Sequence, residues 1–281
     1  MQFIPAPRPS PIVGRWYAGD PEVLGDQVDA YIDQAKKSAD PIPGKIIGLV
    51  APHAGHVYSG ATAGYAYQAI KGDTRDLVVV LSPFHQYFPG DLLTTAFASY
   101  QTPLGDVPVA EDLLTELDRE LQKTGDSLRQ VENDDEHSLE IQLPFLQRSL
   151  AEDFTILPLM LRSHNSVKLK TLSDALYALT KARNVIFIAS TDLSHFHPER
   201  TAKKLDAAML AQIEKMSPEG ALEADKSGRA AACGVSAVAA MLWTTLSFGA
   251  HQAKILHYST SADVTGNWSS VVGYGSAAIV I

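Results

Sequence analysis

The sequence predicts an α/β protein with three layers, in which helices cover both faces of a central mixed, largely parallel sheet. Three runs rich in Val and Ile, at 46–53, 77–85 and 185–195, lack alternation, which is typical of strands buried on both faces. Segments with helical spacing lie between such runs. No repeat or low-complexity linker interrupts the pattern, so we expect a single domain over 1–281, with 1–14 as an N-terminal arm.

Each element follows from local signals. A helix is expected over 21–37, because Asp20 can cap it and Pro21 suits its first turn. By the same kind of reasoning the other predicted helices are 61–70, 111–123, 139–150, 168–181, 198–216, 218–226 and 235–245, and the other strands are 91–99, 155–161, 253–258 and 270–281.

Composition argues against several functions. The 281 residues carry a formal charge of −9 and no basic tract, which disfavours nucleic-acid binding. No apolar segment approaches the roughly 20 residues that span a bilayer, and the Pro-rich start does not resemble a secretory signal. The single cysteine, Cys233, rules out an intramolecular disulfide and makes a reducing cytoplasm the simplest compartment.

Polar residues follow the three apolar runs, where ligands bind in open α/β sheets. They are His53, His85, and the pair Asp192 and His195. Imidazole is the commonest metal ligand in proteins. The recurrence of this arrangement predicts a shared polar pocket, most simply a metal site.

Other interpretations stay open for these residues. His53 could instead cap its loop by bonding backbone carbonyls. Asp192 and His195 could form a general base, a proton relay, metal ligands or an ion pair that stabilises the loop.

Two further features could belong to the pocket. The polar loop 134–138 contains Glu136 and His137, which we expect to support the ligands from outside. Cys233 stands at the predicted start of a helix, a position that favours thiolate, although a lone cysteine among alanines is also typical of a buried apolar position.

Taken together, the motifs resemble the Memo family, whose prokaryotic branch is called AmmeMemoRadiSam system protein B. The resemblance runs nearly end to end. It rests on GRWY at 14–17, APHAG at 51–55, YSG at 58–60, SPFH at 82–85, TPLG at 102–105, DEHSLE at 135–140, DLSH at 192–195, CG at 233–234, YSTS at 258–261 and VVGY at 271–274.

This resemblance implies a fold like that of the LigB-type extradiol dioxygenases, which hold non-haem Fe(II) with two histidines and a carboxylate. It implies that His53, His85 and Cys233 are the metal ligands, and that Asp192 and His195 are pocket residues. Because thiolate replaces carboxylate, copper becomes a candidate beside iron, and zinc is a further one. His56, where many relatives carry an aromatic residue, adds an imidazole near the pocket.

The resemblance implies a metal-dependent oxidoreductase in which Asp192, His195 and Cys233 act in catalysis. It also implies partners, an AMMECR-type protein and a radical SAM protein of the same system. The alternative is a non-catalytic adaptor that uses an inherited pocket to recognise a peptide or protein. Zinc-dependent hydrolysis, and a metal-free dyad of Cys233 with His195, are two further hypotheses.

Overall fold

The computed structural model describes residues 1–37, 41–133 and 135–281, so Asp134 of the predicted polar loop lies outside the described residues. Its main sheet has the strand order β10-β12-β2-β9-β3-β8-β4-β7, with β11 paired to β12. These strands are β2 (Ile46–Ala51), β3 (Leu77–Pro83), β4 (Leu92–Thr95), β7 (Leu128–Val131), β8 (Thr155–Leu161), β9 (Val185–Ser190), β10 (His195–His197), β11 (Gln252–Thr260) and β12 (Val271–Val280).

The centre of this sheet is parallel and largely apolar. The strands β2, β9, β3 and β8 pair in parallel, whereas β12 joins β2 and β4 joins β8 in the antiparallel sense. Every residue of β2, β3 and β9 is buried, as expected for strands covered on both faces. The predicted mixed, largely parallel sheet is therefore confirmed.

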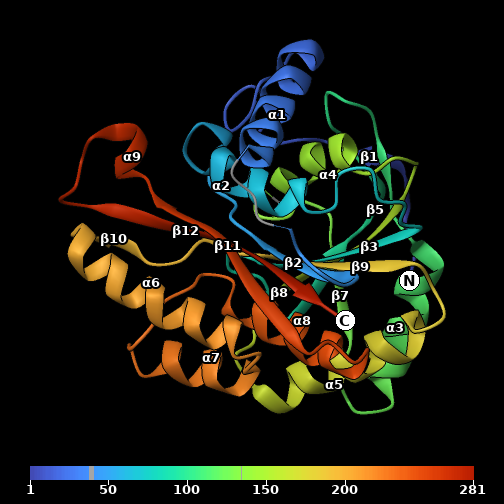
Figure 1. Ribbon diagram of the computed structural model, residues 1–281. Coiled ribbons are helices and arrows are strands. Elements are labelled where there is room, and N and C mark those ends of the chain that lie inside the picture. The colour runs from blue at the N-terminus through green and yellow to red at the C-terminus, as the bar shows by residue number, and fades with distance from the viewer. Residues whose placement is uncertain (38–40, 134) are drawn as a thin grey trace.

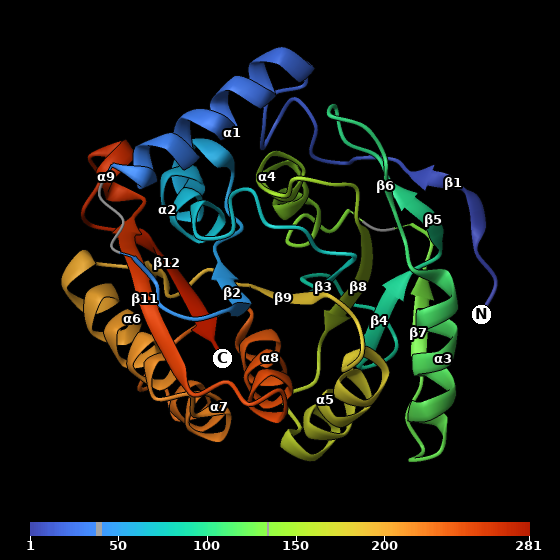
Figure 2. The same ribbon diagram turned by 45° about the vertical axis from the view of Figure 1, so that its right-hand side comes forward.

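Helices form a layer on each side of the sheet (Figures 1 and 2). One layer contains α1 (Pro21–Lys36), α2 (His56–Gln68) and the short α4 (Leu143–Ser149), which follows a 3-10 turn at Glu140–Gln142. The other contains α5 (Ser166–Thr180), α6 (Glu199–Glu214), α7 (Pro218–Lys226) and α8 (Val235–Ser247), while α3 (Glu111–Gln122) packs beside α5 and the short α9 (Ala262–Thr265) leads into β12. The predicted three-layer α/β/α fold is thus confirmed.

Three predicted elements differ from those observed. The helix predicted over 139–150 divides into the 3-10 turn at Glu140–Gln142 and α4. The helix predicted to start at 61 begins at His56, whose backbone N–H donates to the carbonyl of Trp16. The strand predicted over 91–99 divides into β4 and β5 (Phe97–Tyr100), which belong to different sheets. The backbone N–H of Phe97 donates to Thr95 Oγ1 at the division.

The N-terminal arm is more ordered than the sequence indicates. Residues of β1 (Ile4–Arg8) pair in parallel with β5, which pairs in turn with β6 (Val107–Pro108), so the arm belongs to a small three-stranded sheet. Beyond β1, the chain turns at 12–17 and meets the start of α2. This path brings the arm to the edge of the main sheet where the parallel strands end.

None of the helices in the described part of the chain has the length and apolar character needed to cross a bilayer.

Candidate metal centre

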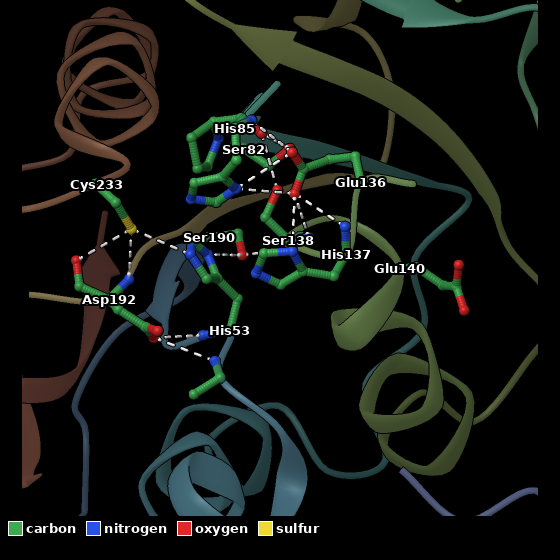
Figure 3. A network of polar contacts seen from close by, with 12 residues as sticks. His53, Ser82, His85, Glu136, His137, Ser138, Glu140, Ser190, Asp192 and Cys233 are labelled. Atoms are coloured by element: carbon green, nitrogen blue, oxygen red, sulfur yellow. Dashed lines mark hydrogen bonds and ion pairs between the residues drawn. The ribbon is translucent and has the colours of Figure 1, made fainter. Parts of the chain in front are cut away.

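Three imidazoles meet beyond the carboxyl ends of the central strands (Figure 3). His53 follows β2, His85 follows β3, and His137 comes from the loop before the 3-10 turn. One ligand nitrogen from each lies within 4.8 Å of the other two, a spacing that allows all three to bind one metal ion. His53 is buried, His137 is partly buried and His85 is the most exposed of the three.

The orientation of His53 is set by Ser190, the last residue of β9. Ser190 Oγ donates its proton to the carbonyl of Ser138 at 2.5 Å, so it can only accept from His53 Nδ1 at 3.1 Å. His53 therefore carries its proton on Nδ1 and keeps a free lone pair on Nε2. Burial, together with the neighbouring His137 and His85, holds the pKa of His53 well below its ordinary value, which favours the neutral form that binds metals.

Glu136 orients His85 in the same way. The Nδ1 atom of His85 lies 3.0 Å from Glu136 Oε1, and the backbone N–H of His85 donates to Oε2 at 2.6 Å. Burial acts to lower the pKa of His85, but the hydrogen bond and charge of Glu136 outweigh it and raise that pKa. The pairing of a carboxylate with the second nitrogen of a metal-binding histidine is a common way to fix its ring.

The Glu136 carboxylate also shapes its own loop. Its Oε1 accepts from the backbone N–H groups of His137 at 2.9 Å and Ser138 at 2.8 Å. Burial acts to raise the pKa of Glu136, but the bonds and charges of His85 and His137 outweigh it and hold that pKa well below its ordinary value. Glu136 is therefore an anion that ties two of the three histidines together, as the sequence predicts for a supporting residue.

His137 is held between aromatic rings. Its ring stacks on His85 with centroids 4.8 Å apart, and the indole of Trp16 covers it with centroids 4.0 Å apart. Its Nδ1 lies 3.3 Å from Glu136 Oε1. Burial is the main reason that the pKa of His137 falls to about 4, so this imidazole is also neutral near pH 7.

Gln142 connects the loop to two strand ends. Its Nε2 donates to the carbonyl of Pro52 at 3.0 Å and to Ser190 Oγ at 2.7 Å. Its Oε1 accepts from the hydroxyl of Tyr67 at 2.7 Å. Because all of these groups are buried, the bonds fix the ends of β2 and β9 relative to the histidine loop.

Asp192 lies on the other side of His53. Its Oδ1 accepts from the backbone N–H groups of His53 at 2.7 Å and Ala54 at 3.3 Å. Burial raises the pKa of Asp192 to about 7, although these two bonds act against the change. A carboxyl group with this pKa can gain or lose a proton near neutrality.

The expected pairing of Asp192 with His195 takes another form. In the described part of the chain these two side chains share no hydrogen bond, because the Asp192 carboxylate bonds the backbone at the start of the His53 loop. Burial and the neighbouring His85 lower the pKa of His195, which places His195 in the electrostatic surroundings of the cluster. A role of His195 as a proton carrier stays a prediction.

Cys233 joins the cluster through His53. Its Sγ lies 3.1 Å from His53 Nε2, and the backbone N–H of Asp192 points to the same sulfur at 3.3 Å. The residue directly precedes the Gly234 cap of α8, as predicted. However, burial and the nearby Asp192 raise the pKa of the thiol, so the thiolate expected from the helix start is disfavoured in the absence of a metal.

The two proposed ligand sets overlap. The sequence predicts His53, His85 and Cys233, whereas the three mutually close ligand atoms belong to His53, His85 and His137. Cys233 approaches the free nitrogen of His53, the same nitrogen that would bind a metal. Imidazoles whose second nitrogens are anchored, with a thiol beside them, are a donor set that suits copper, zinc or iron.

Two residues near the loop take up positions outside the cluster. His56, expected to support the pocket, is buried against Phe145 with ring centroids 4.9 Å apart, and its Nε2 lies 3.2 Å from the carbonyl of Ile141. Glu140, the last residue of the DEHSLE motif, is buried and bonds the N-terminal arm. Figure 3 shows Glu140 pointing away from the imidazoles.

Several residues of the centre escape analysis of the sequence alone. Trp16 and Gln142 belong to segments that carry no metal-binding pattern of their own, and Ser190 lies within the 185–195 run without being one of its predicted site residues. Ser190 is the polar residue at the end of the apolar strand β9, where it pairs with Ala51 at the end of β2, and this position is the single signal that could have indicated it.

The chain belongs to the Memo-like protein family, whose sequence model matches residues 8–278. A MEMO1 family protein of Nitrosopumilus maritimus is 34% identical over 272 residues, covering 94% of this chain and 96% of its own length. Another from Methanopyrus kandleri is 32% identical over 277 residues, covering 96% of each chain. Among solved structures, an uncharacterized protein of Escherichia coli K12 has the same kind of fold, with a TM-score of 0.51 and 14% identity over 82% of this chain and 99% of that one.

Proposed function

We propose that the protein is a metal-dependent oxidoreductase with a non-haem iron or copper ion at the histidine cluster. The observation that supports this most strongly is the convergence of His53, His85 and His137, whose ligand nitrogens lie within 4.8 Å of one another. The bonds of Ser190 and Glu136 to the second nitrogens add to it, since metal-binding histidines are normally anchored in this way.

The chain supplies binding, orientation and a proton carrier. His53 and His85 hold the ion in this proposal, and either His137 or Cys233 is the third ligand. A bound iron or copper ion supplies one-electron chemistry and binds anionic substrate oxygens. Asp192, with a pKa of about 7, takes a proton from the substrate or returns it to the product at its carboxylate.

Metal analysis tests the first half of the proposal. Protein purified without chelator or affinity metal should contain about one equivalent of iron or copper, and His53→Ala should lose it. His251→Ala, at an exposed histidine, is the matched control and should keep the metal. Zinc alone in the wild-type protein would favour the hydrolase hypothesis. Full metal occupancy in His53→Ala would contradict the assignment of the site.

Oxygen consumption tests the second half. The metal-loaded protein should consume O₂ with a simple catechol as probe, and Asp192→Asn should lower kcat more than KM. No oxygen consumption by fully loaded protein with a panel of catechols would contradict the dioxygenase-like reaction while leaving the metal site intact.

A non-catalytic adaptor is the second candidate, and the residue after His195 favours it. Phe196 is 75% exposed and has a left-handed backbone with φ of 62°, although it is a bulky residue. An exposed aromatic ring on an unfavourable left-handed backbone is suited to contact with a partner protein. AMMECR-type and radical SAM proteins are the partners we propose. Retention of such a protein by wild-type chain and by a His53→Ala, His85→Ala double variant alike would favour the adaptor function.

A further inference from the structure

A buried carboxylate joins the N-terminal arm to the histidine loop. We define the N-terminal strap as residues 8–17. Glu140, which is fully buried, contacts the strap at three places: Arg8 Nη1 donates to it at 2.6 Å, the Tyr17 hydroxyl donates to it at 2.6 Å, and the Ser10 hydroxyl donates to it as well. Arg8 Nη2 also donates to the carbonyl of Glu136 at 2.8 Å.

The far end of the strap lies on the metal centre. The Trp16 ring covers His137, and the carbonyl of Trp16 accepts the backbone N–H of His56 at 2.8 Å. His137 is thereby enclosed between Trp16 on one side and His85 on the other. Of the three histidines, His137 has the longest contact from its Nδ1 to an anchoring oxygen, 3.3 Å. Trp16 of the strap therefore restrains the ring of His137, the histidine least tightly held by hydrogen bonds from its Nδ1.

The three strap contacts all depend on the Glu140 carboxylate. Arg8 and Glu140 are both buried, with side chains 2% and 0% exposed. Removal of the carboxylate charge takes away the charged acceptor that Arg8, Ser10 and Tyr17 share, which weakens the attachment of the strap to the histidine loop. Release of the strap would also move Trp16 away from His137.

We propose that Glu140 is a positioning residue, which clamps the N-terminal strap so that Trp16 holds His137 in the orientation that binds the metal. This inference rests on the proposed metal site. It assigns to Glu140 an effect on metal affinity, although Glu140 itself lies outside the cluster. The N-terminal strap is then part of the centre.

A double-mutant cycle on metal affinity tests the clamp. Co²⁺ would be titrated into metal-free wild-type protein, Glu140→Gln, Trp16→Leu and the double variant, with the visible spectrum as readout. We expect each single variant to bind Co²⁺ about 10-fold more weakly, with an altered spectrum. The double variant should be no weaker than the weaker single variant, because both changes remove the same restraint.

Controls separate positioning from general destabilisation. Ser173→Ala removes a buried hydroxyl that bonds Leu169 and Ala240 in the opposite helix layer, and it should lower thermal stability while leaving Co²⁺ affinity unchanged. If Glu140→Gln does not fold, Tyr17→Phe, which removes one bond of the clamp, replaces it in the cycle.

Three results would overturn the inference. Folded variants of Glu140 that bind Co²⁺ with wild-type affinity and spectrum would refute the clamp while leaving the metal site in place. Fully additive losses in the cycle would show that Glu140 does not act through Trp16. Absence of Co²⁺, Cu²⁺ and Fe²⁺ binding by the wild-type protein would instead refute the metal site, and the clamp with it.

Discussion

Ser190 Oγ lies 3.1 Å from His53 Nδ1 and gives its only proton to the carbonyl of Ser138. This relationship decides which nitrogen of His53 carries the proton and which keeps an unprotonated lone pair, because a hydroxyl that has already donated can only accept. It also joins the end of β9 to the loop after β2, two segments far apart in the sequence. The chemistry of the centre thus depends on a serine that is not itself a ligand.

Ser190→Ala should weaken metal binding without removing it. The variant leaves all imidazoles in place but removes the acceptor that fixes His53, and loss of such a partner lowers metal affinity by about 10-fold to 100-fold. Titration with Co²⁺ measures the change, and Ser173→Ala again serves as the control for loss of a buried hydroxyl. Unchanged affinity in a folded Ser190→Ala variant would show that the tautomer of His53 is set by another group.

Glu136→Gln should lower the pKa of His85. Two effects oppose one another at this imidazole: burial acts to lower its pKa, and the Glu136 carboxylate outweighs burial and raises it. A neutral amide removes the largest raising effect and leaves burial with the smaller effect of the Asp192 charge, so the pKa of His85 should fall. Titration of the His85 ring by NMR in metal-free protein measures this. A pKa that stays raised would contradict the assignment of Glu136 as the cause.

Because of His56, we expect the free energy of unfolding to fall as the pH falls below 6.5. Burial lowers the pKa of His56 to about 4 from 6.5. Between these two values the unfolded chain binds a proton that the folded protein excludes, so the free energy of unfolding falls as the pH falls from 6.5 towards 4. The difference in pKa corresponds to about 3 kcal/mol at pH 4.

His56→Phe should remove that part of the pH dependence. Phe keeps the packing against Phe145 but leaves the carbonyl of Ile141 without the ring donor, which costs about 1 kcal/mol at pH 8. Urea unfolding at pH 8, 6 and 4.5 should therefore show a smaller loss of stability in the variant than in the wild type. His251→Phe, at an exposed position, is the control. If the free energy of unfolding fell equally with pH in His56→Phe and in the wild type, His56 would not be the source of this pH dependence.

The buried strands and the residues that follow them could be predicted from sequence for a physical reason. A strand covered on both faces must be apolar throughout, so the polar residue at which the run stops marks the sheet edge. This locates His53 and His85 directly. It does not locate His137, whose loop meets the same edge only because Ser138 Oγ donates to the carbonyl of Pro83 and Gln142 bonds Pro52.

A pattern in one segment of the sequence can also predict the wrong protonation state, because burial by distant segments can outweigh the effect of that segment. The start of α8 predicts a thiolate at Cys233, but the surroundings contributed by the ends of β2 and β9 raise the pKa of the thiol instead. In a similar way, the residues next to Glu140 in the sequence do not indicate its three partners, which the path of the N-terminal arm supplies. Such partners depend on contacts between distant segments, which no single segment encodes.

The close contact between α1 and α2 provides a paired test of packing. A Cβ atom added at Gly64 on α2 would lie 2.5 Å from the carbonyl oxygen of Tyr31 on α1, a backbone atom that cannot move alone. Gly64→Ala should therefore destabilise the protein by about 1–3 kcal/mol, as overpacking does. At Gly25 on α1, the nearest atoms to an added Cβ are those of the Arg148 side chain at 3.9 Å, an ordinary contact.

Gly25→Ala should consequently stabilise the protein by up to about 1 kcal/mol, since alanine is the better helix former. The two variants make the same chemical change in adjacent helices and differ in the space available to the added methyl group. Opposite signs of the change in unfolding free energy would therefore isolate the effect of the contact with Tyr31. Urea unfolding at pH 7.5 measures both. Because α2 begins only three residues after His53, Gly64→Ala should also weaken Co²⁺ binding if the helices separate as rigid bodies. Destabilisation by both variants to the same extent would contradict the contact between Gly64 and Tyr31.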